Sequence, residues 1–216
     1  MSYFSPLFRR RSCPVPTWRA WLLLAIAALL ASWITRHALY PFLAVTEPLP
    51  GGTLIVEGWA GDATLHRALA EMRSGHFSRC FVTGGPLELG APLSEHKTFA
   101  ELGGATLLRI GIPSNQLVAV PSPAVKRDRT LTAAQTLREW LDAHSDTETN
   151  FTLMTGSVHA RRSWLLFEDA LKPQRRVGVI AAPPMDFDPQ DWWRTSQGFR
   201  TVTSEALAYV YARFLR

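Results

Sequence analysis

The sequence predicts an α/β protein, with a three-layer Rossmann-like domain built on a mainly parallel five-stranded sheet and preceded by one transmembrane helix. Two observations predict the domain. Short apolar runs alternate with stretches of helical spacing, as expected of right-handed βαβ units. Most of these runs end at glycine or proline, as strands do before a turn. A third observation predicts the transmembrane helix, since a longer uncharged run lies near the amino end of the 216-residue chain.

The uncharged run extends from Ala20 to Thr35, between Arg19 and Arg36. As a helix it measures about 24 Å, short of a hydrocarbon core of about 30 Å, but apolar residues continue beyond it. A cleaved signal peptide and a buried core helix are the alternatives, and the long basic region before the run favours an anchor over both. We divide the chain into a cytoplasmic basic tail (1–19), a transmembrane anchor (20–40), a linker (41–52) and a Rossmann-like domain (53–216).

The net charge of +5 is concentrated at the amino end, where no acidic residue precedes Glu47. Because the flank of a span that is richer in arginine and lysine stays in the cytoplasm, we expect a membrane-anchored protein whose globular domain is extracytoplasmic. This distribution, without a basic–aromatic motif, gives no indication of nucleic-acid binding. On that topology Cys13 and Cys80 lie on opposite sides of the membrane and cannot pair.

Strands of one sheet are expected over 53–57, 80–83, 117–120, 151–155 and 177–181. Helices are expected between them, each with one apolar face. The first is capped by Asp62, the second runs over 94–110, the third over 128–141, and the fourth starts near Ser157. A last helix carries an apolar stripe made of Leu207, Val210, Tyr211 and Phe214.

The candidate site follows from the sheet, because open α/β sheets bind ligands beyond the carboxyl ends of their strands. Polar residues and glycines follow four of the five strands, and this convergence is a stronger signal than any one of them. In strand order they are Glu57, Gly58 and Asp62; Gly84 and Gly85; Asp128, Arg129 and Thr130; and Ser157, His159, Arg161 and Arg162.

The turn after the fourth strand places His159, Arg161 and Arg162 at a helix start. Cations there oppose the helix dipole, whereas an anion is favoured, so we expect these arginines, with Arg129, to hold an anionic ligand. The alternative without a ligand is that Arg161 and Arg162 are a solvated surface pair and that His159 bonds to a neighbouring carbonyl group.

His159 is the candidate general acid or base, with Glu57 or Asp128 orienting it or acting in its place. Asp128 could instead only cap its helix, and Gly84–Gly85 could only form a turn. The histidines lack the paired spacing of zinc ligands, whereas Mg²⁺ on Glu57, Asp62 or Asp128 is left open. The glycine motif of dinucleotide-binding proteins is absent. The G-x-S-x-G elbow is absent as well, which argues against Ser157 as the nucleophile of a serine hydrolase. The cofactor stays unknown.

Several pieces of the chain resemble the YdcF/SanA/ElyC family of bacterial envelope proteins, in a subgroup with a Val-Glu-Gly-Trp opening. The pieces are Leu54–Trp59, Thr83–Pro86, Gly111–Pro113, Asp128–Thr130, Thr155–Arg162 and Trp192–Gly198. The resemblance extends over about residues 53–215 and, with the topology above, implies a place in the bacterial inner membrane. The resemblance implies a Rossmann-like domain, often membrane-anchored, that is linked to cell-envelope or lipid-carrier metabolism.

Three functions remain open at this stage. The first is an anchored domain that binds, and in one version processes, an anionic envelope intermediate such as a lipid-linked saccharide. The second is a non-catalytic binding or scaffold module in envelope assembly. The third is a cytoplasm-facing enzyme with a nucleotide-like cofactor, against which the arginine distribution argues.

We predict that residues 46–216 lie outside the cytoplasm, because the arginines precede the span. Alkaline phosphatase fused after Arg216 should be active, and a reporter that functions only in the cytoplasm should be inactive there. The reverse pair of activities would contradict the topology.

Overall fold

The computed structural model describes residues 17–88, 90 and 92–216, so most of the predicted basic tail, with Cys13, lies outside the described residues. The chain divides into two units, residues 1–36 and 37–216. Helix α1 (Trp18–Leu43) has a mean hydropathy of 1.7 over its most apolar window, none of which is buried. It is therefore long and apolar enough to cross a membrane, and it extends beyond the predicted span at both ends.

The second unit contains one five-stranded, entirely parallel sheet in the order β3-β2-β1-β4-β5. Its strands are β1 (Thr53–Glu57), β2 (Arg79–Gly84), β3 (Leu117–Pro121), β4 (Asn150–Gly156) and β5 (Arg176–Ala182). The five predicted strands and their common sheet are thus confirmed. Buried apolar runs form these strands because both faces of the sheet are covered.

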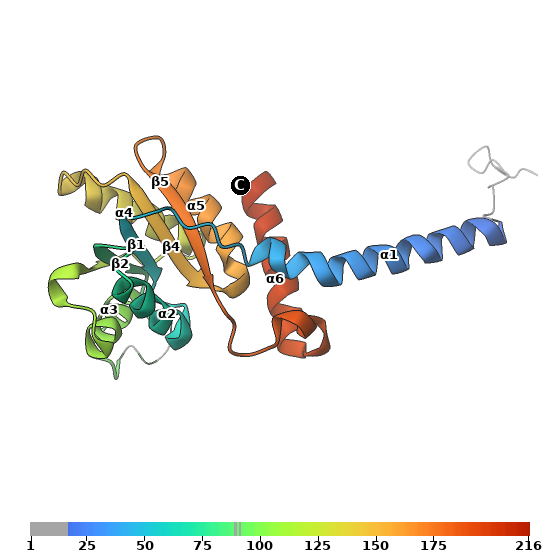
Figure 1. The fold of residues 1–216 in the computed structure, drawn as a ribbon, viewed down its shortest axis with the longest axis horizontal. Helices are drawn as coiled ribbons and strands as arrows, with labels where there is room; N and C mark the ends of the chain where they lie inside the picture. Colours follow the sequence, from blue (N-terminus) through green and yellow to red (C-terminus); the bar gives the residue numbers. More distant parts are fainter. Residues whose placement is uncertain (1–16, 89, 91) are drawn as a thin grey trace, which may run out of the picture. The chain divides into compact units, whose positions relative to one another are not determined.

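Helices cover both faces and make the domain three-layered (Figure 1). α2 (Gly61–Arg73) and α3 (Phe99–Ile110) pack on one face, and α4 (Arg129–Ala143) and α5 (Ala160–Leu171) pack on the other. In β1, Leu54 and Val56 point towards α2 and α3, whereas Ile55 points towards α4 and α5. Since side chains alternate along a strand, Glu57 faces the same side as Ile55.

Helix α6 (Ser196–Phe214) follows the short 3₁₀ segment η3 (Pro189–Arg194) and packs on α5 rather than on the sheet. Its buried residues are Gly198, Val202 and Glu205. The stripe predicted from the sequence lies on another side of the helix and is exposed, with Leu207 72% and Phe214 70% accessible. An apolar stripe usually marks the core-facing side of a helix, and here it does not.

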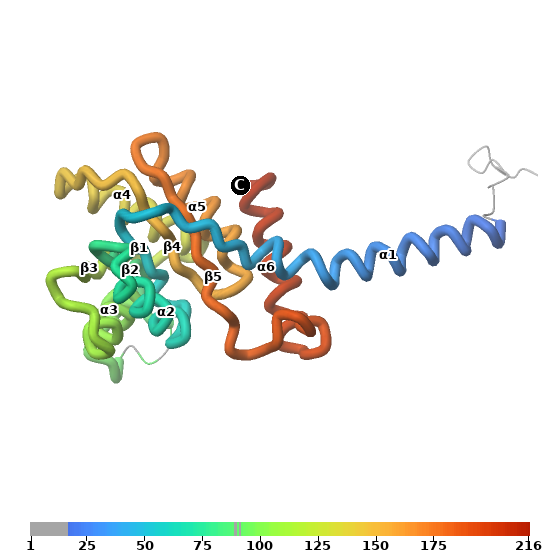
Figure 2. The backbone as a smooth tube through the Cα atoms, viewed as in Figure 1, coloured from blue at the N-terminus to red at the C-terminus, as the bar shows by residue number. Residues whose placement is uncertain are grey.

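The segment predicted as a linker is part of the folded unit. Phe42 and Leu43 still belong to α1, and the following residues cross β5, the edge strand, on their way to β1 (Figure 2). Glu47 exchanges two backbone hydrogen bonds with Val179 of β5, at 2.8 and 3.0 Å. The proline-rich composition therefore marks an edge segment that pairs at one point only, not a spacer.

Three helix starts differ from expectation. Helix α3 begins at Phe99 rather than at Ser94, because Thr98 and Glu101 form a capping box. Asp62 lies exposed in the first turn of α2 and makes no capping bond. Asp128 precedes α4 in a left-handed conformation, also without a capping bond from its side chain, so neither predicted aspartate cap forms.

Glycines let α3 approach the loop after β1. A Cβ atom on Gly58 would lie 2.2 Å from the carbonyl oxygen of Phe99, and one on Gly103 would lie 2.9 Å from Cα of Gly58. Glycine has a low helix propensity, so the Gly103–Gly104 pair weakens α3. The close approach of Gly103 to the backbone of Gly58 explains why the first of these two positions is a glycine.

Gly103→Ala should lower the free energy of unfolding by about 1–3 kcal/mol, since the new methyl group meets backbone that cannot move aside. Gly104→Ala is the matched control, because its Cβ would meet only side chains at 3.4 and 3.5 Å. It should be neutral or stabilising by about 0.4–1 kcal/mol. Chemical denaturation of both variants measures the difference, and equal effects would contradict the close approach.

Candidate functional site

The candidate site begins at Glu57, the last residue of β1, which is 1% exposed. Its Oε1 accepts a hydrogen bond from Nε1 of Trp59 at 3.2 Å. Its Oε2 is buried and has no hydrogen-bond partner. A buried carboxylate oxygen without a donor costs free energy, so this atom is an open acceptor inside the protein.

Trp59 connects Glu57 to the turn after β4. Its ring meets that of His159 edge to face, with centroids 4.9 Å apart. His159 ends the 3₁₀ turn η2 (Ser157–His159) and directly precedes α5. The first and fourth strands therefore place a carboxylate, an indole and an imidazole next to one another, as the sequence predicted for Glu57 and His159.

Glu205 of α6 completes the group. Nδ1 of His159 lies 2.7 Å from Oε2 of Glu205, although the ring N–H is not directed along that line. Oε1 of Glu205 lies 2.5 Å from Nε of Arg162, and Nη2 of Arg162 also donates to Oε2 at 3.3 Å. One carboxylate, 5% exposed, thus holds both the histidine and the arginine.

The electrostatics of this group favour ionised partners. Burial acts to raise the pKa of Glu205, but the neighbouring His159 and the hydrogen-bonded, charged Arg162 outweigh it and hold that pKa below its usual range. Burial acts to lower the pKa of Arg162, but Glu205, with a further contribution from Glu57, raises it overall. Glu205 and Arg162 are therefore a charged pair at neutral pH.

The turn that carries His159 is unusually formed. Ser157 has a φ of 46°, a left-handed conformation that is rare for a residue other than glycine. Its Oγ lies 3.2 Å from the hydroxyl of Tyr40, at the end of α1. Ser157 therefore bonds to the helix that precedes the domain, and no hydrogen bond joins it to His159 within the described part of the chain.

Further buried oxygens lie beside Glu57. Thr83 is its register partner on β2, and Thr155 follows Met154, the partner of Val56, on β4. The hydroxyls of Thr83 and Thr155 have no hydrogen-bond partner, and neither has that of Ser163 on α5. The carboxyl edge under α5 is therefore polar inside, although apolar residues pack below it.

The predicted arginines do not converge as an uncompensated cationic cluster, because each has a different partner. Arg162 pairs with Glu205, and Arg129, which is largely exposed, pairs with Glu88. Arg161 donates to the backbone carbonyl of Phe42 and lies over the ring of that residue.

The other predicted residues lie at the carboxyl edge but outside this group. Among the described residues, no hydrogen bond or ion pair joins Asp62, Asp128 or Arg129 to His159 or Glu57, so neither aspartate orients the histidine. Gly84 and Gly85 serve the start of α3, where the nitrogen of Phe99 donates to the carbonyl of Gly85. Thr130 is the second residue of α4.

Glu205 is the residue that the sequence analysis missed. The sequence does contain a signal, because Glu205 is the one acidic residue in α6. It also follows Gly198 and Val202 at a spacing of four and then three residues, which puts all three on one side of the helix. A single carboxylate on a buried face is rarely tolerated without a partner.

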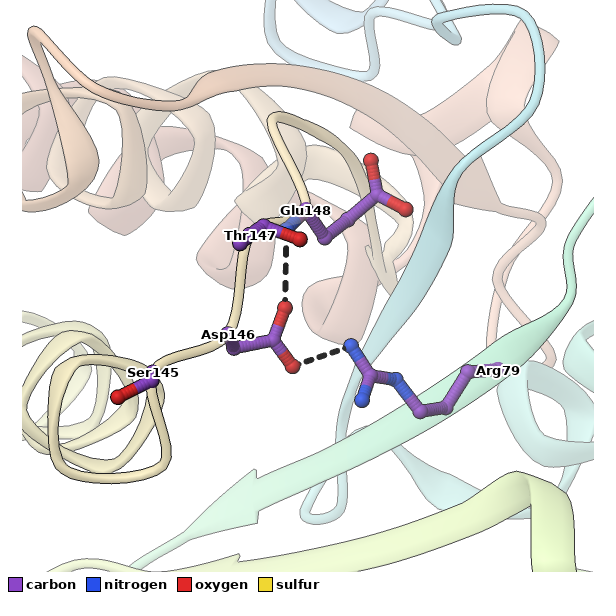
Figure 3. A pocket seen from close by; sticks show the side chains of 5 residues that line it. All are labelled: Arg79, Ser145, Asp146, Thr147 and Glu148. Atoms are coloured by element: carbon purple, nitrogen blue, oxygen red, sulfur yellow. Dashed lines mark hydrogen bonds and ion pairs between the residues drawn. The ribbon is translucent and has the colours of Figure 1, made fainter.

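A depression at the opposite edge of the sheet is a poorer candidate. Figure 3 shows its lining residues, Arg79 and the turn from Ser145 to Glu148. Arg79 pairs with Asp146 at 2.5 Å, and Asp146 accepts from the backbone nitrogen of Glu148 at 3.0 Å. These polar groups satisfy one another and fix the turn before β4.

No group of three or more His, Cys, Asp or Glu side chains that could hold a metal ion occurs among the described residues. A scan against models of protein families gives no match, and a search of curated proteins gives none either. Fold and site therefore define the chain as a Rossmann-like α/β protein with a helix of membrane-spanning length before the domain.

Glu205→Gln should destabilise the protein at pH 7 by about 3 kcal/mol, because it leaves the largely buried Arg162 without its counter-charge. Since the folded-state pKa of Glu205 is lowered, its contribution is complete above the unfolded value of about 4.3 and declines as pH falls below it. The difference between the variant and the parent in urea unfolding should therefore shrink below about pH 4.

Glu139→Gln, at an exposed position of α4, is the control and should change little at either pH. A Glu205→Gln protein as stable as the parent at pH 7 would show that the pair is not needed for folding.

Proposed function

We propose that residues 37–216 form the binding domain of a membrane-anchored envelope protein that acts on an anionic, phosphate-bearing intermediate such as a lipid-linked saccharide. The site is the carboxyl edge between β1 and β4. His159 is its general acid or base, and Glu205 rather than Glu57 or Asp128 orients it.

The observation that carries this proposal is the 2.7 Å contact between Nδ1 of His159 and Oε2 of Glu205, with Glu205 fixed in turn by Arg162. A carboxylate beside Nδ1 favours the proton on that nitrogen, which leaves Nε2 available as the base. The histidine is 29% exposed at its side chain, so a ligand can reach it from solvent.

Two features support a ligand with both phosphate and hydroxyl groups. The start of α5 has no side-chain cap, so its backbone N–H groups and the helix dipole favour an anion there. The unpartnered Oε2 of Glu57 favours a donor, and a saccharide hydroxyl is such a donor. The negative charge of Glu57 also discourages a ligand that carries phosphate alone.

The chemistry that fits is transfer or hydrolysis at a phosphate ester. Nε2 of His159 takes the proton of an attacking hydroxyl or water as the new oxygen–phosphorus bond forms. The same proton passes to the departing oxygen as the old bond breaks. Such general acid–base catalysis contributes about 10²–10⁴-fold.

An apolar helix near the amino end supports the location, because a lipid-linked substrate lies at the bilayer that α1 would enter. The family resemblance supports an envelope role, and the arginines before the span support an extracytoplasmic domain. A scaffold without catalysis is the alternative that the test must separate.

His159→Ala should lower phosphate release from a prenyl pyrophosphate by about 10²–10⁴-fold while ligand affinity changes much less. The measurements are phosphate release and calorimetric binding with the full chain in vesicles. His66→Ala is the matched control, an exposed histidine on α2 that should leave both quantities unchanged.

The outcomes separate the alternatives. Binding by the parent with no phosphate release, and with full cellular function in His159→Ala, would support the scaffold instead. If the parent binds neither the prenyl pyrophosphate nor inorganic pyrophosphate, the ligand class is wrong.

A further inference from the structure

Helix α6 exposes an apolar face that the domain does not cover. Its exposed members recur at helical spacing, and they are Phe199, Leu207, Val210, Tyr211 and Phe214. Leu215, 70% exposed, follows directly. We call these six residues the α6 stripe. Residues spaced three or four apart share one side of a helix, so Leu207, Val210, Tyr211 and Phe214 form a continuous surface, and Phe199 lies about two turns before it.

The charges on α6 are of one sign outside the core. Arg200 and Arg213 are exposed, whereas the single acidic residue, Glu205, is buried under His159 and Arg162. An apolar face bordered by arginines and rich in aromatic residues is typical of helices that lie in a membrane interface. Anionic headgroups complement this charge, whereas a second copy of the helix would repeat it.

Helix α6 also packs on the end of α1. Within residues 37–216, the ring of Phe42 meets that of Tyr209 edge to face at 5.4 Å, and Leu43 is completely buried in a cluster with Val202 and Trp192. His37 meets Trp193 in the same way at 5.8 Å. The last turns of α1 are therefore fixed to α6 and η3.

The short connection to α1 limits how far α6 can lie from the bilayer. If α1 crosses the bilayer, as in the proposed function, the chain leaves the hydrocarbon near Arg36. Residues 37–43 then cover only about 10 Å of helix axis beyond it. The part of α6 around Tyr209, which contacts Phe42, is therefore tethered within about 10 Å of the point where the chain leaves the hydrocarbon.

We infer that the α6 stripe is a second membrane contact, in which α6 lies in the interface and inserts its apolar side chains among the lipids. The occupant of this surface is the bilayer that holds α1, with anionic lipid beside Arg200 and Arg213. Because α6 also carries Glu205, the contact would hold the His159 site at the membrane surface, where a lipid-linked substrate arrives.

The test uses the full chain with Cys13→Ser, reconstituted in vesicles of phosphatidylcholine and phosphatidylglycerol. Single cysteines replace Leu207 or Val210 and carry a nitroxide; the native Cys80 is buried, and burial raises the pKa of its thiol to about 12, so it reacts poorly. Gln135→Cys, exposed on α4, is the matched control. Collision rates with oxygen and with a nickel chelate report the depth of each label.

Labels at 207 and 210 should lie about 5–10 Å below the headgroup boundary, shielded from nickel, whereas the label at 135 should be in water. Nickel access at 207 and 210 equal to that at 135 would overturn the inference. So would spin–spin broadening at 207 that disappears on dilution with unlabelled protein, since a second copy would then cover the stripe.

An alkaline carbonate wash separates this inference from the proposed anchor. Extraction of the protein by the wash would mean that α1 is not a span, so the anchor and the depth argument built on it would both fail. Retention of the protein with a nickel-accessible stripe would refute the α6 contact alone.

Discussion

The buried Glu205 carboxylate is the interaction on which the candidate site depends. It comes from α6, outside the three layers, and it holds two residues of the turn and helix that follow β4, His159 and Arg162. Removing either partner would leave a charge in a poorly solvated place, which costs several kcal/mol. The position of α6 and the position of the histidine ring are therefore coupled through Glu205, so a change in one is expected to alter the other.

The end of α1 belongs to the same assembly. Tyr40 bonds to Ser157, and Arg161 donates to the carbonyl of Phe42, so both sides of the site turn are tied to the last turns of α1. The left-handed backbone conformation of Ser157 is energetically unfavourable, and these contacts help to stabilise it. The site is thus formed by the domain together with the last turns of the preceding helix, not by the sheet edge alone.

The site is also less positive than a simple anion pocket. Glu205 compensates Arg162, Glu57 adds a buried acceptor, and the helix start contributes partial positive charge. A ligand that presents an anionic group to the helix and a hydroxyl to Glu57 matches this distribution better than inorganic phosphate does.

The sequence by itself determined the sheet, because buried parallel strands are continuous apolar runs and their ends carry turn residues that can be read locally. It also placed Glu57 and His159 at one edge, since the carboxyl ends of parallel strands meet there. Only the tertiary structure decided the partners of the charged residues, because an ion pair such as Arg162–Glu205 joins elements far apart in sequence. The same holds for α6: its spacing showed an apolar stripe at Leu207 and Val210, but which side faces the core depended on where Glu205 could find its counter-charges.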